Sequence, residues 1–133
     1  MDPMKFFQIA EFLASLKNNL NFTEISYRTV INRLYYGIFH LVQKKLNIFI
    51  PETEIKRCHA YVKNHIDNSK IRSDYSDLEA FRVEVDYNLL KPIKQTHMKD
   101  ALRLKNRILN KISDPDYDPY DTDDEYFFYK SKS

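Results

Sequence analysis

One long apolar stripe constrains this sequence more than any other feature. Between residues 24 and 47, large apolar side chains recur at intervals of three and four, the spacing of one buried face of an α-helix. Thr23 stands just before this segment as a good N-cap residue, with the apolar Phe22 preceding it. The pattern therefore predicts a long helix over residues 24 to 47. Its apolar residues are Tyr27, Ile31, Leu34, Ile38, Val42 and Leu46.

The segments on either side of this helix show the same period. Residues 4 to 20 predict a first helix. Pro51 suits the opening turn of a third helix, because the N–H that proline lacks is not needed there. We expect this third helix to end near Asp67 and Asn68.

The second half of the chain predicts two more helices. Ser76 followed by Glu79 is typical of a capping box, and we expect a fourth helix to start there with an apolar face that extends to Leu89. Pro92 disfavours the α conformation in the residue before it, so a break is expected at that point. Thr96 is then expected to cap a fifth helix that continues to residue 112.

Composition favours an all-α fold. The chain has one glycine in 133 residues, which leaves little material for hairpins and excludes a Gly-rich phosphate loop. Cys58 is the single cysteine, and neither a signal peptide nor an apolar run of about 18 residues is present, so we expect a cytoplasmic protein without a membrane span. Short connections between amphipathic helices predict an up-down bundle of four to five helices.

Charge divides the chain near residue 113. Residues 114 to 133 contain seven acidic residues and two lysines, a net charge of −5, whereas residues 1 to 113 contain 19 basic and 12 acidic residues, a net charge of +7. Dense negative charge and two Asp-Pro steps predict a flexible, acidic, Tyr-rich tail after a helical domain. The basic domain suits phosphate-bearing partners, although such charge also merely solubilises many proteins. The acidic tail either keeps the protein soluble or lies on the basic domain as a mimic of nucleic acid.

The predicted long helix also carries a recognisable motif. Its residues 27 to 40, YRTVINRLYYGIFH, resemble the helix of the HEPN family (higher eukaryotes and prokaryotes nucleotide-binding) with the pattern R-x-x-I-N-R-x-Y-Y-x-x-F-H. Two further matches follow in the same order. They are His59, and residues 81 to 87, FRVEVDY, which are similar to the family's R-x-x-x-D-Y. The resemblance spans about residues 6 to 112.

The resemblance implies a bundle of four or five helices, frequently a homodimer, from a prokaryotic toxin-antitoxin or defence system. Such proteins often stand beside a small nucleotidyltransferase, and several branches are metal-independent ribonucleases. Those enzymes carry an arginine, then four to six residues, then a histidine, with the motifs of two subunits facing each other. Arg33 and His40 have that spacing here. In the ribonuclease branches the motif usually lies on a later helix, where this chain has no histidine at the required distance.

Three residues are the predicted catalytic group. Arg33, Tyr36 and His40 are at i, i+3 and i+7, so they share one helix face. In RNA cleavage without a metal, His40 would take the proton of a 2′-hydroxyl as the base. Arg33 would hold the charge that develops on the phosphate, and Tyr36 would orient either group.

The predicted substrate-binding residues come from two helices. They would form a polar pocket beside Arg33, and they are Asn32, Arg28, Arg82, Asp86 and Tyr87. The alternative is structural: Arg33 binds Asp86 in a buried pair that sets the helix register, or Arg82 and Asp86 form an ion pair within one helix.

Neither a metal nor a cofactor is expected. His59 and His65 fall on different helix faces, and no Cys/His cluster supports zinc. Three functions stay open at this level, of which the third is a purely structural helical adaptor. The first is a protein that binds RNA or nucleotide phosphate, with a candidate ribonuclease site, and the second is a noncatalytic module that acts with a nucleotidyltransferase.

Overall fold

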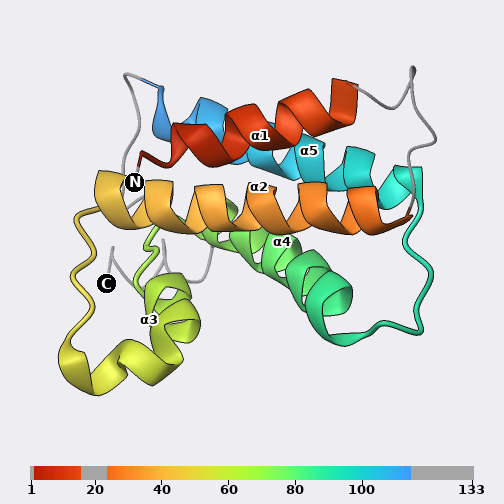
Figure 1. Cartoon of the computed structure of the whole chain (residues 1–133). Coiled ribbons are helices and arrows are strands. Elements are labelled where there is room, and N and C mark those ends of the chain that lie inside the picture. The colour runs from red at the N-terminus through yellow and green to blue at the C-terminus, as the bar shows by residue number, and fades with distance from the viewer. Residues whose placement is uncertain (1, 16–23, 115–133) are drawn as a thin grey trace.

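The chain folds as an all-α, up-down helical bundle. The computed structural model describes residues 2–15 and 24–114, and it has no strand among them. Along the bundle, α1, α2, α4 and α5 alternate in direction (Figure 1). The described elements are α1 (Met4–Ser15), α2 (Glu24–Lys45), the 3-10 helix η2 (Glu52–Arg57), α3 (Cys58–Asn64), α4 (Ser69–Tyr87) and α5 (Gln95–Ile112).

Helix α2 lies at the centre of the bundle. It contacts α1, α3, α4 and α5, and α1 and α4 lie on different sides of it (Figure 1). The middle of the predicted apolar stripe, from Ile31 to Val42, is buried, whereas Tyr27 and Leu46 at its ends are half-buried. Residues outside the stripe are buried as well, because the helix has neighbours on more than one side. Its buried residues are Val30, Ile31, Leu34, Tyr35, Gly37, Ile38, Phe39, Leu41 and Val42.

The single glycine of the chain lies where α1 crosses α2. A Cβ atom at Gly37 would lie 2.5 Å from Cε1 and 2.8 Å from Cδ1 of Phe7, and 3.0 Å from Cβ of Phe6. Phe7 is 1% exposed, so its ring has no free space into which it can move. The absence of a side chain at Gly37 therefore sets the distance between the two helices.

Helix α4 begins earlier than the sequence pattern predicted. The side chain of Asn68 accepts hydrogen bonds from the backbone N–H groups of Lys70 (3.1 Å) and Ile71 (3.0 Å), so Asn68 is the N-cap. The predictions that Ser76 caps this helix and that Asn68 ends the preceding one were wrong. A serine three residues before a glutamate also fits the interior of a helix, where Ser76 and Glu79 lie.

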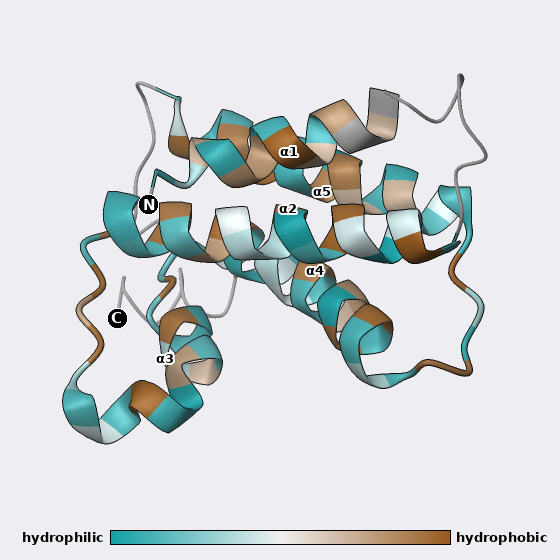
Figure 2. Ribbon diagram, in the orientation of Figure 1, coloured by the Kyte–Doolittle hydropathy of each residue, from teal (hydrophilic) through white to brown (hydrophobic). Residues whose placement is uncertain are grey.

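The boundaries of the other elements also differ from the predictions. The predicted third helix is divided, since the 3-10 helix η2 follows Pro51 and α3 ends at Asn64. Helix α4 ends at Tyr87, so Leu89 does not extend its apolar face but lies in the next loop, 76% exposed. Part of the loop between α4 and α5 is hydrophobic (Figure 2). Thr96 is not the cap of α5, because Lys94 holds that position and its backbone N–H donates to Nδ1 of His97 (2.9 Å).

Several predictions lie outside the described residues. These are the end of the first helix (residues 16 to 20), the cap at Thr23, and the acidic tail after Asp114. Among the residues that are described, no helix combines the length and the apolar character that crossing a membrane requires.

We predict that Gly37→Ala destabilises the fold. Overpacking at a buried contact costs about 1 to 3 kcal/mol, which exceeds the gain of about 1 kcal/mol in helix propensity. Urea unfolding followed by circular dichroism measures the difference. In a Phe7→Leu background the same substitution should cost less, and a Gly37→Ala protein more stable than wild type would contradict the close helix crossing.

We predict that Asn68→Ala lowers the free energy of unfolding by about 1 kcal/mol, because two backbone N–H groups of α4 lose their acceptor. Ser76→Ala is the matched control and should change it by less than about 0.5 kcal/mol. Chemical denaturation of both variants compares the two positions. If Ser76→Ala lowered the free energy of unfolding more than Asn68→Ala, the helix would start at Ser76, as the sequence pattern predicted.

Candidate functional site

Five polar side chains meet between α2, α3 and α4. We call them the polar cluster: Tyr35 and Tyr36 from α2, His59 from α3, and Tyr75 and Arg82 from α4. Because α2 and α4 run in opposite directions, residues in the middle of α2 lie opposite the middle of α4 (Figure 1). The short helix α3 closes the third side of the cluster.

Tyr35 connects the three helices of the cluster. Its hydroxyl lies 2.7 Å from Nδ1 of His59 and 3.1 Å from the hydroxyl of Tyr75. Tyr35 and Tyr75 are fully buried, and burial raises the pKa of both hydroxyls far above the ordinary value. Both phenols are therefore neutral and act only as hydrogen-bonding groups.

Arg82 places a positive charge among the aromatic rings. Its guanidinium carbon lies 5.0, 6.0 and 5.7 Å from the ring centroids of Tyr35, Tyr36 and Tyr87, within range of cation–π attraction. Burial acts to lower the pKa of Arg82, but the neighbouring tyrosines outweigh it and the pKa is raised, so the group stays charged. Its Nε atom is buried without a hydrogen-bond partner among the described residues.

Asp86 binds Asn32 rather than Arg33. The side-chain amide of Asn32 donates to both carboxylate oxygens of Asp86 at 3.1 and 3.2 Å. Arg82 also approaches this carboxylate at 3.7 Å, which confirms the predicted ion pair within α4. The alternative in which Arg33 binds Asp86 was wrong. Arg33 is exposed and makes no hydrogen bond or ion pair with the described residues.

Arg28 is engaged at the end of α4, away from the cluster. Its guanidinium donates to the backbone carbonyls of Val85 (2.9 Å), Asn88 (3.3 Å) and Lys91, and to the carboxylate of Glu24 (2.8 Å). These carbonyls belong to the C-terminal end of α4 and the loop after it, where helical partners are missing. Arg28 therefore caps a helix, and its donors are not available to a ligand.

His40 lies two turns beyond Arg33 on α2. Its ring stacks on Phe6 (5.4 Å between centroids) and meets the edge of Phe39 (5.2 Å). Partial burial lowers the pKa of His40, which keeps the imidazole neutral at pH 7. Seven residues of helix separate Arg33 and His40 by about 10 Å along the axis, with Tyr36 between them.

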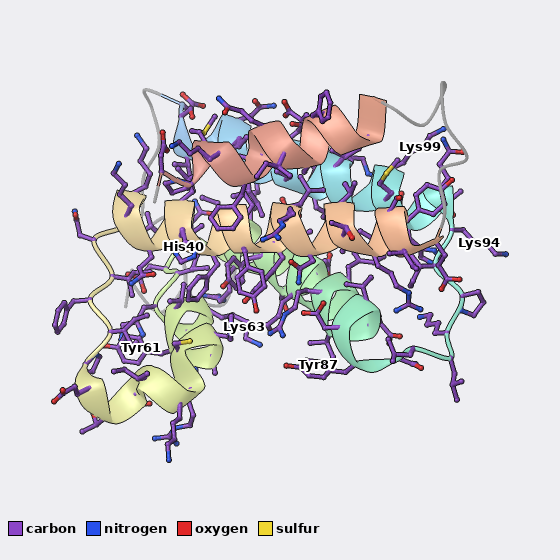
Figure 3. All side chains as sticks on the ribbon, viewed as in Figure 1. His40, Tyr61, Lys63, Tyr87, Lys94 and Lys99 are labelled. Carbon is purple, nitrogen blue, oxygen red and sulfur yellow. The ribbon has the colours of Figure 1, made fainter. Side chains whose placement is uncertain are left out.

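The predicted site residues do not all gather in one place. Tyr36 and Arg82 meet in the polar cluster, and Asn32 and Asp86 adjoin it. Tyr87 is 74% exposed and lies at the end of α4, far along the bundle from His40 (Figure 3). A substrate that contacted all of them would have to extend along α2 rather than bind at a single point.

Three residues of the polar cluster had no functional role in the sequence-based prediction: Tyr35, Tyr75 and, on α3, His59. The ring of His59 contacts Tyr35, Tyr36 and Phe39. Burial lowers its pKa, and the charge of Arg82 lowers it further, against an opposing effect of Glu79. The available signal was its place in the order of the matched motifs, but spacing along the chain cannot show that it meets Tyr35.

No group of three or more His, Cys, Asp or Glu side chains that could hold a metal ion occurs in the described part of the chain. Comparisons of this chain with protein-family models, curated proteins and solved structures found no match.

We predict that the free energy of unfolding decreases as the pH falls below about 6.5. His40 and His59 have lowered pKa values in the fold, so the unfolded chain binds more protons in this range. Their contribution is complete above about pH 6.5 and is lost as the pH falls through the folded pKa values. His59→Gln should flatten the dependence measured by urea denaturation between pH 7.5 and 5.5. His65→Gln, at an exposed position, is the matched control, and equal slopes in the two variants would contradict the prediction.

Proposed function

We propose that this chain is a HEPN-like protein that binds RNA or another nucleotide phosphate on the face where α2, α3 and α4 meet. The observation that carries the proposal is a pair of arginines: Arg33 has no carboxylate partner among the described residues, and Arg82 has one long ion pair, with Asp86. Arg33 is exposed and unpaired among the described residues, and Arg82 is 3.7 Å from its nearest carboxylate oxygen. Guanidinium groups bind phosphate through a planar fork of donors.

The charge of the helical domain supports the same proposal. Residues 1 to 113 carry a net charge of +7, and neutralising phosphates releases counterions into the solvent. The resemblance of residues 27 to 40 to the HEPN helix is a second, independent line of support for the proposal. On that resemblance, the chain belongs to a toxin-antitoxin or defence module and acts as a homodimer in the cytoplasm.

Metal-independent cleavage of RNA is the activity that Arg33, Tyr36 and His40 would perform. A neutral His40 takes the proton of a 2′-hydroxyl, and the 2′-oxygen attacks phosphorus to form a 2′,3′-cyclic phosphate. The bond from phosphorus to the 5′-oxygen breaks, and this oxygen takes a proton from water. Arg33 stabilises the negative charge of the transition state. The lowered pKa of His40 supports the role of base, because the imidazole is unprotonated at neutral pH.

A noncatalytic module that acts with a nucleotidyltransferase is the second candidate. The observation that favours it is the internal hydrogen bonding of the polar cluster. Tyr35, His59 and Tyr75 satisfy one another, and Asn32 satisfies Asp86, as in a network that fixes helix register. In this function the polar cluster would stabilise the fold, and Arg33 would bind the ligand or partner without taking part in catalysis.

We predict that the purified protein binds a fluorescein-labelled single-stranded RNA and cleaves it in the presence of a chelator. Arg33→Ala should weaken binding and reduce the salt slope of the affinity by about one phosphate contact, measured by anisotropy. His40→Ala should abolish cleavage but retain binding, because the base does not contribute to phosphate affinity.

Arg103→Ala is the matched control, since Arg103 is an exposed arginine on α5 whose one ion pair with a described residue is to Asp100. Cleavage that survives in both Arg33→Ala and His40→Ala would rule out this pair as the site. Binding without cleavage by wild type would favour the noncatalytic module. Equal affinity in wild type, Arg33→Ala and Arg103→Ala would contradict phosphate binding through Arg33.

A further inference from the structure

The hydrogen bonds inside the polar cluster determine which nitrogen of His59 carries the proton. Three groups form a chain: the hydroxyl of Tyr75, the hydroxyl of Tyr35 at 3.1 Å from it, and Nδ1 of His59 at 2.7 Å from Tyr35. Two hydroxyl hydrogens must be placed along this chain. The direction in which each hydroxyl donates follows from the partners that it has.

Tyr75 must donate to Tyr35. Tyr75 is fully buried, and the Tyr35 hydroxyl is its one hydrogen-bond partner in the described part of the chain. A buried hydroxyl hydrogen without an acceptor costs about 1 to 3 kcal/mol. If Tyr35 donated to Tyr75 instead, the hydrogen of Tyr75 would have no acceptor.

Tyr35 must then donate to His59. Its oxygen accepts from Tyr75, and its own hydrogen has Nδ1 of His59 as the remaining acceptor. The positive charge of Arg82 lies beside Tyr35 and favours a hydroxyl that turns its hydrogen away from the guanidinium. If Nδ1 of His59 carried a proton and donated it to Tyr35, the hydrogen of Tyr35 would be left without an acceptor.

The proton of neutral His59 is therefore on Nε2. This atom makes no hydrogen bond to the described residues. Among those residues, the one side-chain nitrogen or oxygen that is both sealed from solvent and unpartnered is Nε of Arg82. Nε2 of His59 and the two terminal nitrogens of Arg82 are therefore not fully sealed, although Arg82 as a whole is only 6% exposed. Both side chains lie against the same two rings, Tyr35 and Tyr36.

We propose that the relay from Tyr75 through Tyr35 holds His59 as a neutral Nε2–H donor, and that this donor and Arg82 bind one phosphate group. The inference rests on the proposed function for its ligand, which is the phosphate of a nucleotide or of RNA. No proton is transferred, so His59 is a binding residue here and not a base. The two donors suit a phosphate because the guanidinium of Arg82 carries a positive charge and the Nε2–H of His59 donates a hydrogen bond in a fixed direction.

The groups around His59 favour the neutral form. Arg82 on α4 and His40 on α2 oppose a second positive charge, whereas Glu79 on α4 attracts one. Glu79 is itself bound by Lys63 of α3 at 3.0 Å, which reduces its attraction for a protonated imidazole. Protonation of Nδ1 would also leave the hydrogen of Tyr35 without an acceptor. The relay therefore keeps the donor pattern of the site constant across neutral pH.

Nuclear magnetic resonance of the full chain labelled with 15N-histidine tests the tautomer without any ligand. We expect Nδ1 of His59 to show the shift of an unprotonated nitrogen and Nε2 that of a protonated one. In Tyr35→Phe and Tyr75→Phe the two tautomers should mix, and the pKa of His59 should rise toward its ordinary value. Tyr61→Phe, a tyrosine of α3 outside the relay, should behave as wild type. A proton on Nδ1 of His59 in the wild-type protein would overturn the proposal.

Titration of the same sample with inorganic phosphate tests whether His59 and Arg82 bind phosphate. The Nε2 signal of His59 should move with saturation in wild type. Tyr35→Phe should bind phosphate about twofold more weakly when its two tautomers are equally populated, because only the Nε2–H form offers the donor. Tyr75→Phe provides the same test if Tyr35→Phe does not fold. An unmoved His59 signal in a protein that still binds RNA would overturn this site and leave the proposed function standing. If the wild-type protein neither shifts the His59 signal with phosphate nor binds RNA, both this site and the proposed function are overturned.

Discussion

Burial of α2 on several sides is the constraint on which the rest of the structure depends. A helix with neighbours around it has few directions in which a polar side chain can reach water, so its polar residues must find partners on other helices. Arg28 binds the end of α4, Asn32 binds Asp86, and Tyr35 binds α3 and α4 together. These contacts set the register of the bundle. Gly37 allows α1 to close the remaining side.

The same constraint separates two kinds of arginine. The guanidinium of Arg28 donates its hydrogen bonds to backbone carbonyls, whereas Arg33 projects from α2 without a partner among the described residues. Arg82 falls between them, because it is buried among tyrosine rings and its Nε atom has no hydrogen-bond partner among the described residues. In the proposed function, this incompletely bonded guanidinium is the group that binds the phosphate. The phosphate-binding proposal depends on this difference between positions and not on the number of basic residues.

Local patterns predicted the elements well and their ends poorly. The apolar period of residues 24 to 47 predicted α2, since a buried face repeats every three or four residues whatever packs against it. Ser76 failed as a cap because its motif is equally compatible with the middle of a helix, whereas Asn68 had the geometry to bind two backbone N–H groups. Arg33 failed as the partner of Asp86, because adjacent residues on a helix point about 100° apart and Asn32 faced α4 instead.

The sequence by itself determined an all-α bundle, the position of the central helix and the ion pair of Arg82 with Asp86, because each depends on residues close together in the chain. The tertiary structure alone decided that His59 meets Tyr35. That contact joins residues 24 positions apart on separate helices, and no local spacing specifies it. The physical reason is that a helix fixes the direction of its own side chains, whereas the packing of helices against each other fixes which of those directions meet.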